Sequence, residues 1–126
     1  MNIEQLENTA EFTNGLVKWI HLLNKHWWED PATGQPIQRN HGELLALIHS
    51  EVSEALEADR KDLMDDKLPH RKGLEVELAD AVIRICDMAG GLGLDLGGAL
   101  AEKLAYNAQR HDHTHEARLQ AGGKKY

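Results

Sequence analysis

The stretch from Leu74 to Met88 constrains the fold most, because its pattern predicts a helix that is apolar on nearly every side. No proline interrupts it, and such a helix is buried on several sides by its neighbours. It nevertheless carries Glu77 and Asp80, which lie three residues apart and therefore on one helix face. Carboxylates are rarely buried unless they are paired or bind a metal ion. The apolar positions of this helix are Leu74, Val76, Leu78, Ala81, Val82, Ile83, Ile85, Cys86 and Met88.

A second acidic pair, Glu51 and Glu54, has the same spacing in a second apolar helical pattern that includes Leu47 and Ile48. One such pair is common on a solvated helix face. Two pairs on facing helices would repel each other strongly in a low-dielectric site unless a cation neutralises them. Oxygen ligands without cysteine or histidine suit Mg²⁺, or Mn²⁺, better than zinc. The sequence therefore predicts a metal site with four ligands, Glu51, Glu54, Glu77 and Asp80.

The composition favours a single all-α domain. The chain has 126 residues, one Phe and two Tyr, and few β-branched residues in strand-like patterns. A net charge of -7 argues against a nucleic-acid-binding surface, so we expect no nucleic-acid partner. The single cysteine excludes a disulfide framework within the chain, and no apolar run approaches the ~18 residues of a membrane span. We expect a cytoplasmic protein with no membrane partner.

We predict an antiparallel bundle of about four main helices, completed by homo-oligomerisation because the third helix is too apolar for one short chain to cover. Asn40 or His41 would lie near the start of the second helix, and Asp95 would cap the fourth. The third would stop at the glycines Gly90-Gly91. Residues 1–112 would form the domain, and residues 113–126 a flexible tail. The predicted helices span about residues 3–25, 42–63, 73–89 and 95–110.

Several further residues are candidates for binding a substrate. Trp27 and Trp28 open a long loop and would either plug the end of the bundle or line a pocket where a planar ring stacks. His49 would reach substrate or lie on the helix surface. Arg84 would contact phosphate, pair with a carboxylate such as Asp87, or point outward. A basic helix face would hold phosphate oxygens, and it comprises Lys103, Asn107 and Arg110.

A di-iron four-helix protein also gathers carboxylates inside a bundle, but it needs Glu-x-x-His pairs on two helices. Neither acidic stretch contains one, because Glu51 is followed three residues later by Glu54, and Glu77 by Asp80. We therefore set this alternative aside.

The spacing of these residues resembles that of the all-α nucleoside triphosphate pyrophosphohydrolases of the MazG-like superfamily. The resemblance spans about residues 44–110. The matching positions are Glu51-x-x-Glu54, twenty-two intervening residues, Glu77-x-x-Asp80, and then Lys103-x-x-x-Asn107-x-x-Arg110.

The resemblance implies an Mg²⁺-dependent enzyme that cleaves a nucleoside triphosphate between the α and β phosphates, giving the monophosphate and pyrophosphate. It implies that the four acidic residues hold the metal, that the basic face holds the triphosphate, and that a dimer or a dimer of dimers completes the bundle. Glu51 or Glu54 would act as the catalytic base. Base preference would lie with Trp27, Trp28 and the loop that follows. The alternative is a non-catalytic helical dimerisation module on the same scaffold.

Overall fold

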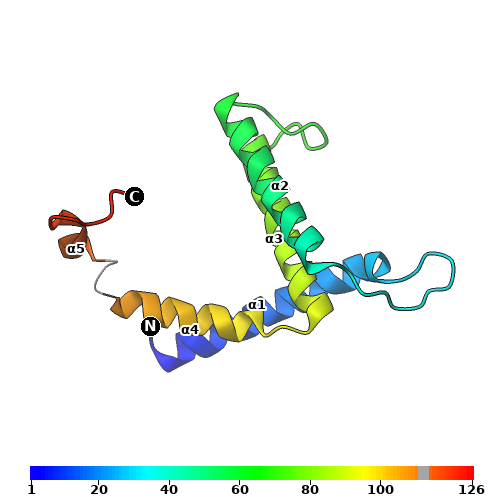
Figure 1. The fold of residues 1–126 in the computed structure, drawn as a ribbon, viewed down its shortest axis with the longest axis horizontal. Coiled ribbons are helices and arrows are strands. Elements are labelled where there is room, and N and C mark those ends of the chain that lie inside the picture. The colour runs from blue at the N-terminus through cyan, green and yellow to red at the C-terminus, as the bar shows by residue number, and fades with distance from the viewer. Residues whose placement is uncertain (111–113) are drawn as a thin grey trace. The chain divides into compact units, whose positions relative to one another are not determined.

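The computed structural model describes residues 1–110 and 114–126, and helices joined by loops make up this part of the chain (Figure 1). These residues contain no β-strand; they form only isolated bridges, between Glu29 and Pro36 and between Met64 and Lys72. The predicted all-α class is confirmed for this part of the chain. The helices are α1 (Ile3–Asn24), the 3₁₀ helix η1 (Lys25–Trp28), α2 (His41–Arg60), α3 (Gly73–Leu92), α4 (Leu96–Gln109) and the short α5 (His115–Leu119).

Two helix starts follow the predicted caps. The Asn40 side chain accepts a hydrogen bond from the backbone N–H of Glu43 at 2.9 Å, which caps α2. The Asp95 side chain accepts one from the N–H of Gly98 at 2.8 Å, which caps α4. The bounds of α2 and α4 therefore agree with the sequence pattern to within a few residues.

The predicted end of the third helix was wrong. Helix α3 continues through Gly90-Gly91 to Leu92, and Gly93, with a φ of 67°, takes the left-handed position after the helix. A Cβ at Gly90 would collide with His21, and one at Gly91 would collide with the indole of Trp28. These two glycines are therefore packing positions, where side chains approach the α3 backbone closely.

The chain divides into two compact units. The first contains residues 1–15 and 95–126. Within it, the Asn14 side chain donates to Asp95 Oδ1 and accepts from the N–H of Gly97, both at 2.8 Å, so the middle of α1 is tied to the start of α4. The predicted domain boundary at residue 112 lies outside the described residues. Helix α5 lies in the segment expected to be a tail, whose flexibility stays a prediction.

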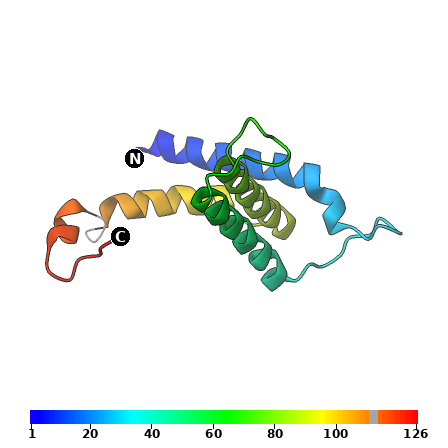
Figure 2. The ribbon, with the colours of Figure 1, turned by 90° about the horizontal axis from the view of Figure 1, so that it is seen from above.

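The second unit spans residues 16–94, and its centre is a helical hairpin in which α2 and α3 lie antiparallel and side by side (Figures 1 and 2). Small residues let the two helices approach closely. Ala55 and Ala81 are buried, and a Cβ at Gly73 would lie 2.9 Å from the Cβ of Ala58. Among the described residues, no large side chain is completely buried, so this hairpin has a thin core.

One side of this hairpin carries an exposed apolar face. On each helix, a stripe of large apolar side chains lies roughly a quarter-turn around the helix axis from the residues that contact the other helix. Following the chain direction, this rotation has the same sense in both helices. Because the helices are antiparallel, the two stripes lie on the same side. The apolar face, whose side chains are 39% to 60% exposed, comprises Leu45, Val52 and Leu56 of α2 and Leu78, Val82 and Ile85 of α3.

None of the helices in the described residues combines the length and the apolar character needed to cross a membrane.

Candidate metal centre

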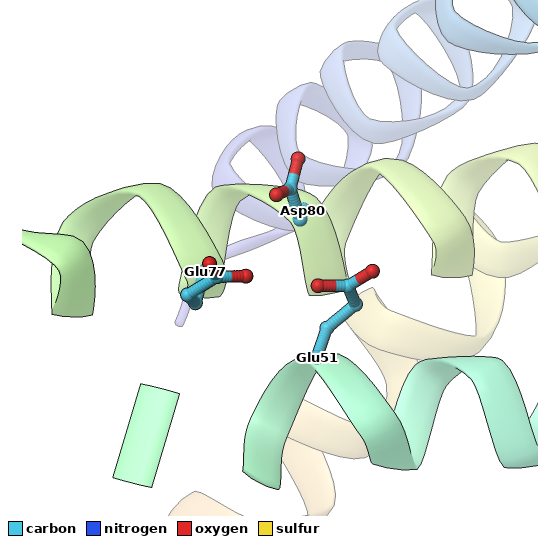
Figure 3. Close-up of side chains that lie close together, drawn as sticks. All are labelled: Glu51, Glu77 and Asp80. Carbon is cyan, nitrogen blue, oxygen red and sulfur yellow. The ribbon is translucent and has the colours of Figure 1, made fainter. Parts of the chain in front are cut away.

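Three of the four predicted acidic ligands meet between α2 and α3. Glu51 reaches from α2 toward Glu77 and Asp80, which lie one turn apart on α3 (Figure 3). One carboxylate oxygen from each residue lies within 4.8 Å of the other two. The i,i+3 spacing on α3 and the register of the antiparallel hairpin together produce this cluster, which we call the carboxylate cluster.

Glu51 is held ionised by an arginine. It is 8% exposed, and its Oε1 accepts a hydrogen bond from Arg84 Nε at 2.8 Å. Burial acts to raise the pKa of Glu51, but the hydrogen bond and charge of Arg84, together with hydrogen bonds from neighbouring acids, hold that pKa below its ordinary value. Of the three alternatives for Arg84, pairing with a carboxylate is therefore the one observed, although the partner is Glu51 instead of Asp87.

The pKa values of the other two carboxylates, Glu77 and Asp80, are raised. Burial, followed by hydrogen bonds and charges from Glu51 and Glu54, raises the pKa of Glu77 to about 7. Burial and the negative charge of Glu51 raise the pKa of Asp80, and Arg84 partly offsets this. Glu77 Oε2 is also buried without a hydrogen-bond partner. With this unpartnered acceptor beside two other carboxylates, the cluster could hold a metal ion.

Glu54 and His49 lie outside the carboxylate cluster. Glu54 is exposed on α2 and is not one of the three residues with closely spaced oxygens, although its charge contributes to the raised pKa of Glu77. His49 is exposed and does not line the cavity beside the cluster. Their proposed roles in metal or substrate binding stay predictions.

A cavity of about 490 Å³ opens beside the cluster, within the second unit, and it shares Glu51, Asp80 and Arg84 with that cluster. This volume lies in the range of small-molecule sites. Besides these three residues, the cavity is lined by one aromatic ring, two apolar side chains and three polar ones. Its remaining walls are formed by Asn24, Trp27, Arg39, Leu47, Ile83 and Asp87.

The two tryptophans have different surroundings. Trp28 is 8% exposed, and its indole N–H donates to Asp87 Oδ2 at 3.0 Å and to Oδ1 at 3.2 Å. This is the environment of a core plug. Trp27 is 62% exposed and lines the cavity. Sequence analysis missed His21, whose Nδ1 lies 2.8 Å from Asp87 Oδ1; the only signal for it was an acidic residue in an apolar helix that needed a partner.

The residues of the predicted basic face belong to the first unit, where Lys103 and Asn107 lie on α4 and Arg110 follows its last residue with an extended backbone. Lys103 and Arg110 both lie over the ring of Tyr106, with Nζ 5.0 Å and Cζ 5.8 Å from its centroid. Asn107 Oδ1 is buried without a hydrogen-bond partner. Whether these residues act together with the carboxylate cluster stays a prediction.

Comparisons with family models, with curated proteins and with solved structures find no match to this chain. The resemblance to the MazG-like superfamily therefore rests on the sequence motifs alone, namely the acidic and basic residues and the segments beside them.

Proposed function

We propose that this protein is an Mg²⁺-dependent nucleoside triphosphate pyrophosphohydrolase that cleaves between the α and β phosphates, giving a nucleoside monophosphate and pyrophosphate. The observation that carries the proposal is the carboxylate cluster: three carboxylates from two packed helices, one of them with a buried and unpartnered oxygen. The cavity that adjoins the cluster has room for part of a nucleotide, and the MazG-like spacing supports the same activity.

In this proposal Glu51, Glu77 and Asp80 hold the metal ion, with Glu54 as a further ligand or as the catalytic base. An ion held there, Mg²⁺ or Mn²⁺, would supply positive charge to the phosphate oxygens and would lower the pKa of a coordinated water. Glu54 is better suited than Glu51 to accept a proton, because it is exposed and lies outside the cluster, whereas Glu51 is buried and bonded to Arg84.

Cationic side chains would balance the triphosphate. Arg84 lines the cavity, and 40% of its side chain is exposed, so its guanidinium is accessible to a phosphate from that side. Lys103, Asn107 and Arg110 would hold the triphosphate, as the MazG-like spacing implies. We place the enzyme in the cytoplasm, with nucleoside triphosphates as its substrates.

We also propose that the enzyme works as a homo-oligomer, either a dimer or a dimer of dimers. The apolar face of the hairpin supports this, because six large side chains at 39% to 60% exposure form a patch of the kind that marks an interaction surface. A second copy would cover it with an identical face across a two-fold axis. The same face favours the alternative function, a non-catalytic dimerisation module, and turnover separates the two.

The test is Mg²⁺-dependent release of pyrophosphate from nucleoside triphosphates. We expect Asp80→Asn and Glu54→Gln to abolish release while the protein stays helical by circular dichroism. Asp59→Asn, an exposed acid on the same helix as Glu54, is the matched control and should leave release unchanged. Full turnover in Asp80→Asn would contradict the proposal, and the absence of turnover with every nucleotide would favour the dimerisation module.

A further inference from the structure

Asp87 is a fixed hydrogen-bond acceptor in the wall of the cavity. It is 9% exposed, on α3, and its carboxylate receives hydrogen bonds from two directions. Oδ1 accepts from the Trp28 indole and from His21 Nδ1, while Oδ2 accepts from Trp28 alone. The edge-on packing of the His21 and Trp28 rings, with centroids 5.6 Å apart, holds both donors in place.

This arrangement leaves one acceptor position for a ligand. A carboxylate offers about four lone-pair positions, and the three contacts leave capacity on Oδ2. Because Asp87 lines the cavity, a donor on a molecule bound there can approach this carboxylate. The three contacts leave one lone-pair position of the Asp87 carboxylate, and a donor on the ligand can occupy it.

We propose that Asp87 makes the cavity selective for nucleotides whose base presents an amino group, namely cytosine, adenine and guanine, over uracil and thymine. The inference rests on the proposed function, since it takes the cavity as the site of the base. An exocyclic amino group projects beyond the ring and can donate to a single carboxylate oxygen. Uracil and thymine present a ring N–H between two carbonyls, so a carboxylate that accepts this proton also faces a carbonyl oxygen.

The remaining walls suit a base that is held by its face and read at its edge. Trp27 is an exposed ring beside the cavity, and base–aromatic stacking is tolerant of base identity. Leu47 and Ile83 supply apolar surface. The guanidinium of Arg39 lies 5.3 Å from the centroid of the Trp28 ring, which places a donor in the same wall for a base carbonyl or ring nitrogen. In this proposal Asp87 recognises the amino group of the base, and Arg39 contacts a carbonyl or ring nitrogen.

The experiment measures binding of α,β-methylene triphosphate analogues of the five nucleosides to the wild-type protein in Mg²⁺ by isothermal titration calorimetry. These analogues cannot be cleaved at the bond in question, so the readout is affinity. We expect the cytosine, adenine and guanine analogues to bind about tenfold or more tightly than the uracil and thymine analogues. Equal or tighter binding of the uracil and thymine analogues would overturn the inference.

Two variants separate edge recognition from stacking. Asp87→Asn presents an amide N–H₂ to the cavity, so it should remove the preference or reverse it toward uracil, whereas the control Asp59→Asn should preserve the wild-type ratio. Trp27→Ala should weaken all five analogues by a similar factor, roughly ten- to a hundredfold. A preserved ratio in a folded Asp87→Asn protein would overturn the inference, and if that variant does not fold, the wild-type ratios decide.

These experiments also distinguish a failure of the inference about Asp87 from a failure of the proposed function. If wild-type protein releases pyrophosphate from all nucleotides with no preference for amino bases, only the inference about Asp87 fails. If no analogue binds and no nucleotide is cleaved, the proposed function fails and the inference fails with it.

Discussion

Replacing Glu77 by Gln should stabilise the metal-free protein at alkaline pH and leave it unchanged in acid. Glu77 has a folded-state pKa of about 7, against an ordinary value of 4.5. Below about pH 4.5 it carries a proton in both the folded and the unfolded chain. Between these values the unfolded chain ionises first, so folded-state stability falls as the pH rises and reaches its minimum above pH 7.

The magnitude follows from the shift in pKa. The difference of 7 minus 4.5 is 2.5 units, which corresponds to about 3 kcal/mol at about 1.4 kcal/mol per unit. Glu77 is only partly buried, and solvent screening reduces the effect to about 1–2 kcal/mol. Glutamine removes the ionisation and keeps a donor for the neighbouring carboxylates. We therefore expect Glu77→Gln to be more stable than the wild type by this amount at pH 8.

The assay is urea denaturation followed by circular dichroism, in chelator, at pH 4.5 and pH 8 and at one protein concentration. Glu75→Gln, an exposed glutamate on the same helix, is the matched control and should show the wild-type dependence on pH. Added Mg²⁺ should restore stability to the wild type at pH 8 and do much less for Glu77→Gln. A Glu77→Gln protein that keeps the wild-type pH dependence, or is less stable at pH 8, would refute this account of the cluster.

Three further predictions concern the arginine at the cluster, two glycines and the apolar face. Arg84→Gln should raise Mg²⁺ affinity about tenfold by calorimetry, because it removes a positive charge that competes for a metal ligand, whereas Arg60→Gln, an exposed arginine on α2, should have little effect. Gly91→Ala should destabilise the fold by about 1–3 kcal/mol in urea, whereas Gly15→Ala, where a Cβ meets open space within a helix, should stabilise it by about 0.5–1 kcal/mol. Val82→Asp should reduce the sedimentation mass to that of a monomer while helicity is retained.

Each of these has an outcome that contradicts it. Unchanged or weaker Mg²⁺ binding in Arg84→Gln would mean that the guanidinium positions Glu51 without competing for it. A Gly91→Ala protein as stable as the wild type would show that the indole does not pack tightly on α3. If wild-type protein sediments as a monomer, or if Val82→Asp keeps the oligomer, the apolar face is not the interface.

Sequence patterns predicted those features that depend on residues close together in the chain. Asn40 and Asp95 were identifiable as caps, since a side-chain acceptor just before an apolar periodic segment satisfies the first free N–H groups. Glu77 and Asp80 were identifiable as a pair on one face of α3, because helix geometry alone fixes that relationship.

Features that depend on how helices pack were missed or left open. Glycines after an apolar run usually signal a helix end, yet Gly90-Gly91 are helical because His21 and Trp28 pack against them. The Arg84–Glu51 ion pair depends on the register between α2 and α3, which neither helix encodes alone. The same holds for His21, 66 positions away from its partner Asp87 in the chain.

The most direct test of the central claim is the identity of the products formed from a nucleoside triphosphate in the presence of Mg²⁺, followed by ³¹P NMR. The carboxylate cluster and the motif spacing predict equal amounts of nucleoside monophosphate and pyrophosphate from the wild-type protein, and neither product when Mg²⁺ is chelated. Nucleoside diphosphate and inorganic phosphate as the products, or unchanged turnover after chelation, would contradict the claim.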